Sequence, residues 1–297
     1  MDIGVVGIGR WGKHLLRNFN SLARVPVCCH RGSRSNREWL DRHYPDVSVT
    51  TDYEAMLGDE TLDAIAIATP IETHAELTRR AVEADKHVFV EKPLATSAAE
   101  ASNLVELVEE SGMVLFVGYI FIYHPLVRQL KAIHRETPVR RLRFAWEKFG
   151  AFDESLLLDL ACHPLSLCYH FFEDQPTSVD VFSTLSATSV PDTVTLAATF
   201  TQGRHCEISI NRLSGAEAKS MTAVTTDGVY AWTELELARF DPESRALKTV
   251  ATRETEPLRV ECQRFVDAVA EESTTHRTDG QFALAVNEMI ESVSDAW

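Results

Sequence analysis

A glycine-rich turn near the start of the chain constrains the fold more than any other feature. A short apolar strand at 2–6 runs directly into the sequence GIGRWG at 7–12. A helical stretch follows, and its spacing predicts an apolar face made of Trp11, Leu15, Leu16 and Phe19. In such a unit the first glycine permits a tight bend, the second lets the backbone approach a diphosphate, and the third lets helix pack on strand. The helix N-terminus adds free N–H groups and a positive dipole end. We therefore expect a dinucleotide here, contacted by Gly7, Gly9, Arg10, Trp11 and Gly12.

Further strand and helix patterns alternate along the first 119 residues. Short continuous apolar runs at 25–29, 62–68, 87–90 and 113–118 are typical of buried strands, and helical patterns end near Ala81 and Glu110. This alternation predicts a Rossmann-type parallel sheet with helices on both faces. Ligands of such sheets bind at the carboxyl ends of the strands. The segments at those ends supply further expected cofactor contacts, namely Ala68, Thr69, Pro70, His74, Glu91 and Lys92.

The end of the second strand bears on the choice of cofactor. An NAD site usually places Asp or Glu there, where it binds the ribose 2′-hydroxyl. This chain has His30-Arg31-Gly32-Ser33-Arg34 instead, with no acid to repel a 2′-phosphate. Arg31, Ser33 and Arg34 could bond to that phosphate, although a solvated basic loop would look the same. We favour NADP over NAD, with these residues and His30 in the cofactor site.

The length and the later patterns predict two domains. A chain of 297 residues exceeds what one ordinary core needs, so we expect a dinucleotide-binding domain at 1–119 and a second domain at 120–297. The second half is rich in strands separated by turns, followed by two helices with apolar stripes. The expected strands lie at 141–148, 178–186, 194–201, 206–211 and 221–225. The stripes are Leu258, Cys262, Phe265 and Val269, then Phe282, Val286, Met289 and Val293.

Composition excludes several classes of function. The net charge of −15 argues against nucleic-acid binding, which requires clustered positive charge. No apolar run reaches the ~20 residues that span a bilayer, and no signal peptide is evident, so we expect a cytoplasmic protein. No pair of the six cysteines has Cys-x-x-Cys spacing. We expect them to be reduced core thiols, and we expect no metal site.

A series of motifs follows in order along the chain: the glycine turn, Ala68-Thr69-Pro70 with His74, Glu91-Lys92-Pro93-Leu94, Gly118-Tyr119, Tyr123-His124-Pro125 and Asp159-x-x-x-His163. Taken in this order, the motifs resemble those of the Gfo/Idh/MocA family of NAD(P)-dependent sugar and inositol oxidoreductases. The resemblance covers essentially the whole chain, and within the family the chain looks most similar to nucleotide-sugar 3-dehydrogenases acting on UDP-linked uronic-acid sugars. An inositol, a free aldose or another sugar stays open as the substrate.

The resemblance implies a second, α+β domain on a mostly antiparallel open sheet, whose open face makes the subunit contact of a dimer or tetramer. It also implies hydride transfer between a sugar carbon and the nicotinamide, with Lys92, Asp159 and His163 at the reacting centre. The chain departs from the family pattern in three respects: Leu156-Leu157-Leu158 stands where the family often has a glycine pair, residues 162 and 164 are Cys and Pro, and the chain is compact. These departures leave the choice of substrate open.

Oxidation of a secondary alcohol needs a base for the hydroxyl proton and a positive group beside the developing alkoxide. His163 suits the base role because an ordinary histidine titrates at about 6.5. Lys92 can polarise the reacting oxygen. On a helix, Asp159 would share a face with His163 and could position it. We expect the substrate to contact these three residues together with Tyr119 and Tyr123.

Two other functions fit parts of the pattern. A cofactor-sensing regulatory protein on the same fold would bind dinucleotide without turnover, but it would not need Lys92, Asp159 and His163. A methyltransferase would share the glycine-rich turn, but Glu91-Lys92-Pro93 and the basic loop at 31–34 disfavour it.

The charge balance generates a prediction about salt. Acidic residues outnumber basic ones by 44 to 29, and only seven of the basic residues are lysine. Concentrated salt screens the self-repulsion of such a surface, so we expect a salt-adapted microbial source and an unfolding midpoint that rises between low and molar KCl. Thermal unfolding followed across that KCl series measures it, and a midpoint indifferent to salt would contradict it.

Overall fold

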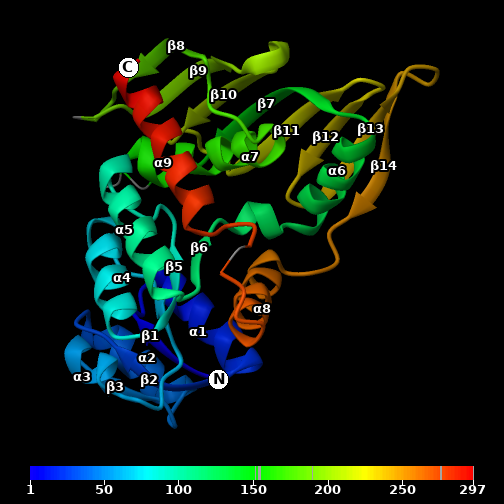
Figure 1. The fold of residues 1–297 in the computed structure, drawn as a ribbon. Helices are drawn as coiled ribbons and strands as arrows, with labels where there is room; N and C mark the ends of the chain where they lie inside the picture. The colour runs from blue at the N-terminus through cyan, green and yellow to red at the C-terminus, as the bar shows by residue number, and fades with distance from the viewer. Residues whose placement is uncertain (151, 153–154, 189, 275, 297) are drawn as a thin grey trace. The chain divides into compact units, whose positions relative to one another are not determined.

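The computed structural model describes residues 1–150, 152, 155–188, 190–274 and 276–296 (Figure 1). Contacts within the chain divide it into two compact units. The first unit comprises Met1–Ile120 and Leu258–Asn287, and the second comprises Phe121–Pro257 and Glu288–Trp297. The sequence-based domain ranges 1–119 and 120–297 stay a prediction, and these units differ from them because the chain returns to the first unit after residue 257.

The first unit is built on a six-stranded sheet in the order β3-β2-β1-β4-β5-β6, with every strand parallel to its neighbours. The chain moves from β1 outward to β3 and then crosses back to β4 on the other side of β1. The gap between β1 and β4 is therefore the switch point at which such sheets bind ligands. The strands are β1 Asp2–Val6, β2 Arg24–Cys29, β3 Ser48–Thr50, β4 Ala64–Ile67, β5 His87–Glu91 and β6 Leu115–Gly118.

Helices cover this sheet, as expected for continuous apolar strands that are buried on both faces. The two C-terminal helices join those of the first 120 residues, although the last one begins in the first unit and ends in the second. The helices are α1 Arg10–Leu22, α2 Arg34–His43, α3 Tyr53–Leu57, α4 His74–Glu83, α5 Ala98–Ser111, α8 Pro257–Ala270 and α9 Gly280–Asp295, with a short 3-10 helix η1 at Ile71–Thr73.

An aromatic cluster joins α1, α8 and the centre of the sheet. Phe265 of α8 makes edge contacts with Phe19 of α1, Phe89 of β5 and Phe116 of β6, with ring centroids 5.8, 5.7 and 5.9 Å apart. All four side chains are fully buried. Edge-to-face pairs add to the free energy of burying aromatic area, so this cluster anchors α8 to a sheet that lies far from it in sequence.

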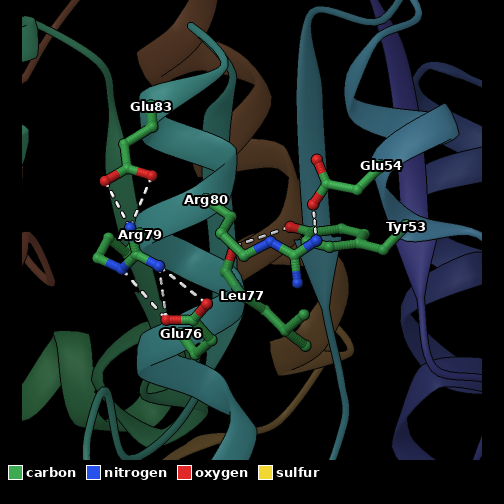
Figure 2. Close-up of polar contacts among 7 residues, drawn as sticks. All are labelled: Tyr53, Glu54, Glu76, Leu77, Arg79, Arg80 and Glu83. Atoms are coloured by element: carbon green, nitrogen blue, oxygen red, sulfur yellow. Dashed lines mark hydrogen bonds and ion pairs between the residues drawn. The ribbon is translucent and has the colours of Figure 1, made fainter.

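Charged residues on α4 form ion pairs within that helix and with α3 (Figure 2). Arg79 bonds to Glu76 and Glu83 of the same helix. Arg80 pairs with Glu54 of α3 and lies over the ring of Tyr53, whose hydroxyl donates to Leu77 O at 2.8 Å. Exposed ion pairs contribute only ~0–1 kcal/mol each, so the buried Tyr53 is the firmer tie between α3 and α4.

The second unit is built on an eight-stranded sheet in the order β14-β13-β12-β11-β7-β10-β9-β8. Among the strands that the structure describes in this unit, β7 and β10 pair in parallel and the other neighbours are antiparallel. The strands are β7 Val139–Glu147, β8 Ser178–Leu185, β9 Thr193–Thr199, β10 His205–Asn211, β11 Ala218–Thr225, β12 Val229–Thr233, β13 Glu236–Asp241 and β14 Ala246–Thr252. The helices are η2 Ile120–Tyr123, α6 Pro125–Glu136, η3 Leu156–Ala161 and α7 Cys162–Phe172, with a 3-10 turn η4 at Thr201–Gly203.

Burial alternates along the central strands of this sheet. From Leu142 onward in β7, and along β10, every second side chain is buried and the others are mostly exposed. One face of the sheet therefore forms the core with α6 and α7, and the other is open. Large apolar side chains are exposed on several strands, including Phe182 and Leu185 on β8 and Leu247 on β14.

The predicted fold class is confirmed: a parallel Rossmann-type sheet is followed by a mostly antiparallel one. The five strands expected in the second half are present as β7 to β11, and both apolar stripes of the last two helices are buried. The prediction that Trp11 lies on the apolar face of the first helix is wrong, because its side chain is 44% exposed. The short β3 and the three strands β12 to β14 were not predicted.

All six cysteines are buried and none forms a disulfide. Burial raises the pKa of Cys28 to about 12, which suppresses the reactive thiolate. None of the helices in the described part of the chain is both long and apolar enough to cross a bilayer.

Candidate functional site

The glycine turn is a close-packed junction between β1, β4 and α1. Gly7 has φ +87°, a conformation that favours glycine, and a Cβ there would lie 2.5 Å from the carbonyl oxygen of Ala68. A Cβ on Gly12 would lie 1.9 Å from the carbonyl oxygen of Gly7. Both positions therefore require glycine, as the turn predicts, because backbone from two other segments fills the space.

Gly9 differs from its two neighbours in the turn. A Cβ built on Gly9 meets nothing within 4 Å. Gly9 is also the N-cap of α1, and it makes no side-chain hydrogen bond to the first N–H groups of that helix. The protein itself does not require glycine here, whereas a diphosphate approaching the helix N-terminus would. Arg10 and Trp11, which follow at the start of the helix, are both exposed.

His74 ties two loops of the sheet edge together. Its Nδ1 lies 2.8 Å from Pro93 O and its Nε2 lies 2.9 Å from Thr69 O, and the side chain is 1% exposed. Burial lowers the pKa of His74 below its usual value, the two carbonyls oppose that shift, and the positive charge of Lys92 adds to it. His74 thus fixes Thr69-Pro70, which follows β4, to the backbone just beyond Lys92.

Lys92 follows the last residue of β5 and is 9% exposed. Glu91, which closes β5, is 8% exposed, and the peptide bond from Lys92 to Pro93 is cis. The carboxyl ends of β1, β4 and β5 therefore carry the glycine turn, the Thr69-Pro70 segment and Lys92 on one edge of the same sheet. This is the convergence that the sequence predicts within the first unit.

The basic loop after β2 is held by its own contacts. Arg31 Nε donates to Thr51 O at 2.8 Å, and Ser33 is the N-cap of α2, accepting from Asn36 N. Arg34 pairs with Glu38 at 2.8 Å while its side chain remains 91% exposed. His30 N donates to Thr50 O, and its ring lies 3.4 Å from Ser33 O. The guanidinium of Arg31 is therefore placed at the carboxyl end of β2, next to the glycine turn in the sheet order.

In the second unit, Asp159 and His163 lie at a change of helix type. Asp159 is in the π-helix η3, which begins at its N-cap Ser155, and His163 is in the first turn of α7. The shared face considered for Asp159 and His163 applies to a regular α-helix, whereas here a wider π turn precedes α7. Such turns are frequent at functional sites. Pro164 is accommodated in the first turn of α7, where a missing N–H costs little.

Aromatic rings surround the imidazole of His163. Phe121 makes an edge contact at 5.1 Å between centroids, and Trp146 of β7 lies at 5.2 Å. Trp232 of β12 in turn packs on Phe121, and Lys219 of β11 holds its Nζ 5.5 Å from the same ring. Sequence reasoning missed Phe121, Trp146 and Lys219. The available signal was the alternation of β7, which puts Trp146 on the buried face.

The two tyrosines differ in their surroundings. Tyr119 is fully buried in the first unit, with its ring 5.4 Å from that of Phe282 on α9. Tyr123 closes η2 in the second unit and is 4% exposed. The ring of Tyr119 is thus a core contact, while the assignment of both residues to a substrate site stays a prediction.

The glycine geometry predicts opposite effects for two alanine substitutions. We expect Gly12→Ala to lower the unfolding midpoint of the ligand-free protein, because its Cβ would collide with backbone. We expect Gly9→Ala to leave that midpoint unchanged and to weaken NAD(P) binding at least ~10-fold, because its methyl group would occupy the diphosphate approach. Thermal unfolding and cofactor titration measure both effects. Unchanged affinity in Gly9→Ala would place the dinucleotide elsewhere.

Known proteins match this chain over long stretches. It is 25% identical over 227 residues to UDP-N-acetylglucosamine 3-dehydrogenase of Acidithiobacillus ferrooxidans, covering 74% of the chain and 70% of that protein. It is 33% identical over 169 residues to inositol 2-dehydrogenase of Paracoccus denitrificans, covering 55% of the chain and 50% of that protein. The solved structure of the Acidithiobacillus enzyme, GnnA, has a TM-score of 0.90 at 22% identity, covering 100% of this chain and 97% of that one. This structural likeness shows the shared fold.

Two family models match consecutive parts of the sequence. The model described as an oxidoreductase family with an NAD-binding Rossmann fold matches residues 1–119. The model of the GFO/IDH/MocA C-terminal domain matches residues 127–231. These ranges contain the glycine turn, Lys92, Asp159 and His163. The chain belongs to the Gfo/Idh/MocA family of NAD-binding oxidoreductases.

Proposed function

We propose that this protein is a dehydrogenase that transfers hydride between NAD(P) and a secondary alcohol of a sugar-like substrate. One observation carries the proposal: the open N-terminus of α1 and the buried Lys92 occupy the same edge of one parallel sheet. The first feature suits a dinucleotide diphosphate, and the second suits a reacting oxygen. The named relatives, which are sugar and inositol dehydrogenases, support the same chemistry.

The residues around the turn fit a dinucleotide. Gly7, Gly9 and Gly12 shape the approach to the helix N-terminus, while Arg10 and Trp11 border it. On the neighbouring strand ends, Ala68, Thr69 and Pro70 would adjoin the cofactor, and His74 would keep that segment in place. When bound, NAD(P) supplies a nicotinamide carbon that accepts or returns a hydride.

The protein side chains would transfer the hydroxyl proton and stabilise the negative charge that develops on the reacting oxygen. A ring nitrogen of His163 takes the hydroxyl proton during oxidation and returns it during reduction. Lys92 Nζ donates a hydrogen bond to the reacting oxygen and stabilises alkoxide character. Asp159 positions the imidazole or holds a sugar hydroxyl. Phe121 and Trp146 limit the water around the imidazole, which preserves these electrostatic interactions.

We favour NADP as the cofactor because of the loop after β2. No carboxylate closes that strand, and Arg31 stands at its end with Nε already fixed to Thr51 O. A guanidinium anchored in this way keeps other N–H groups for a phosphate. His30 and Ser33 shape the loop, and the exposed Arg34 adds positive charge near it.

A UDP-linked sugar is the substrate that we favour, because one relative with broad coverage is named for a UDP-sugar 3-dehydrogenase. An inositol is the alternative, since another relative is named for it. Tyr119 and Tyr123 complete the proposed substrate contacts. We further propose a cytoplasmic enzyme from a salt-adapted microbe. Its subunits would pair through the open sheet face, where Phe182 and Leu247 are exposed.

A substrate screen tests the function. Purified protein is mixed with UDP-sugars, inositols or aldoses and with NADP or NAD, and formation of NADPH or NADH is followed by absorbance. We expect turnover with a UDP-sugar and faster turnover with NADP. Cofactor binding without reduction by any of these substrates would favour a regulatory role instead, and a strong preference for NAD would reverse the cofactor assignment.

Two substitutions test the assigned chemistry. We expect Lys92→Met and His163→Ala each to lower kcat by ~10²-fold or more with cofactor affinity largely retained, because each removes acid–base or electrostatic assistance. Lys248→Met and His205→Ala make comparable changes on β14 and β10 and serve as controls. Steady-state kinetics and cofactor titration provide the readout. Near-normal turnover in either test variant would remove that residue from the mechanism.

A further inference from the structure

Glu261 is a carboxyl group enclosed in the first unit. It lies in α8 with its side chain 1% exposed, and no N–H or O–H donor of the described residues reaches its Oε1. A buried carboxylate without donors is costly, whereas a neutral carboxylic acid is much less so. Neither the family match nor the proposed reaction gives this residue a role.

The packing of α8 on the sheet brings Glu261 to the end of β5. Phe265, one helical turn later, contacts Phe89 of β5 and Phe116 of β6. From Phe265 back to Glu261 the helix rises about 6 Å, and from Phe89 forward to Glu91 the strand advances about 6.6 Å. Phe89 and Glu91 share one face of the sheet. An α8 that runs antiparallel to β5 therefore sets Glu261 against Glu91.

The connection after α8 agrees with that direction. Beyond the helix the chain returns along β6, where Val117 N donates to Thr278 O at 2.9 Å and His276 stacks on Phe116. Residues 276 to 278 thus advance in the same sense as β6. The helix before them consequently descends from the carboxyl edge of the sheet, with Glu261 nearer that edge than Phe265.

Gly118 leaves room for a carboxyl group at this place. It is the register partner of Glu91 on β6, and a Cβ there would lie 3.3 Å from Glu91 Oε2. The carboxylate of Glu91 therefore lies over the backbone of Gly118, on the face that α8 covers. The strand end is shaped to keep the Glu91 side chain in this position.

The charges around Glu261 favour its neutral form. Burial raises the pKa of Glu261 well above its usual value, and the negative charge of Glu91 raises it further. A second ionisable group on this face is the imidazole of His276, which stacks on Phe116 and whose pKa is lowered by burial, so that its neutral form is favoured. Of the other described elements, β6 contributes apolar side chains and Gly118, and α1 contributes Phe19, while its Arg17 is exposed. The neighbouring ionisable group on α8 itself is the buried thiol of Cys262.

We propose that Glu261 is a positioning residue for Lys92: its neutral carboxyl group donates a hydrogen bond to Glu91, and this carboxyl pair fixes the strand end from which Lys92 projects. The role assigned to Lys92 rests on the proposed function, while the carboxyl pair itself does not. Because successive side chains leave a strand on opposite sides, holding Glu91 on the α8 face determines the side on which Lys92 lies. His74 fixes the same segment on the other side of Lys92, through the contact of its Nδ1 with Pro93 O.

The pH dependence of stability tests the pair without any substrate. Glu261 keeps its proton in the folded protein at pH values where the unfolded chain has lost it, so its contribution to stability declines as pH rises from about 4.5 towards the folded pKa. We compare wild type with Glu261→Gln, which is neutral at every pH, by denaturant unfolding from pH 5 to 8. The unfolding constant of wild type relative to the variant should rise about tenfold per pH unit until the pH reaches the folded pKa of Glu261, and should level off above it.

The matched control is Glu271→Gln, the same change at an exposed position just after α8. Its unfolding constant should follow that of wild type at every pH. A ratio of wild type to Glu261→Gln that does not change with pH would show an ionised Glu261 and would overturn the proposal.

The reactivity of Lys92 tests the positioning. Each variant is briefly acetylated, and labelling of Lys92 relative to the exposed Lys248 is quantified by peptide mass spectrometry. Glu261→Leu removes the group that donates to Glu91, so the Glu91 carboxylate beside Lys92 is no longer fixed in position. We therefore expect the labelling rate of Lys92, relative to that of Lys248, to change at least ~3-fold. Glu261→Gln keeps a donor and should restore most of the wild-type rate. Equal rates in wild type and Glu261→Leu would overturn the positioning role.

These readouts separate the inference from the proposed function. If no sugar supports turnover while both readouts behave as expected, the proposed function fails and the carboxyl pair stands. If turnover occurs, Glu261→Leu should lower kcat about 10-fold with cofactor KM little changed, and Glu261→Gln should recover most of that loss. Wild-type turnover in Glu261→Leu would contradict the positioning role and would leave the proposed function intact.

Discussion

The contact between the carbonyl of Gly7 and the first turn of α1 is the constraint on which the rest of the first unit depends. Because Gly12 has no side chain, the helix starts directly against the turn that follows β1, and Gly7 in turn touches the carbonyl of Ala68 beyond β4. Three backbone segments are thus locked at the switch point of the sheet. This junction sets the N-terminus of α1 at the same edge of the sheet as Lys92, which follows β5 beside β4.

Much of the first unit could be predicted because its signals are local. The glycine turn, the continuous apolar strands and Glu91-Lys92-Pro93 are each recognised from a few neighbouring residues. The structure places the turn and Glu91-Lys92-Pro93 at the ends of these strands, on one edge of the sheet. Trp11 was assigned to the wrong side of its helix because periodicity was read without the turn geometry. Strands such as β14, whose side chains are nearly all exposed, lack the alternation that identifies a strand.

The surroundings of the site residues were much harder to predict. His163 could be identified from its spacing to Asp159, but the rings of Phe121 and Trp146 reach it from segments about 42 and 17 residues earlier, through tertiary packing that no local pattern encodes. The π turn at Leu156–Ala161 likewise has no signature in the local hydrophobic pattern. The burial of Glu261 became evident only once α8 was placed on the sheet.

The return of the chain to the first unit after residue 257 affects how the protein can be synthesised. When residue 120 leaves the ribosome, all six parallel strands exist, yet the aromatic surface of Phe89 and Phe116 lacks the helix that carries Phe265. That apolar surface stays uncovered while some 140 further residues are translated, which is the kind of exposure that chaperones recognise. An N-terminal fragment cut at the family-model boundary would keep this bare surface permanently, so a soluble dinucleotide-binding fragment of this protein must include residues 258–287 as well.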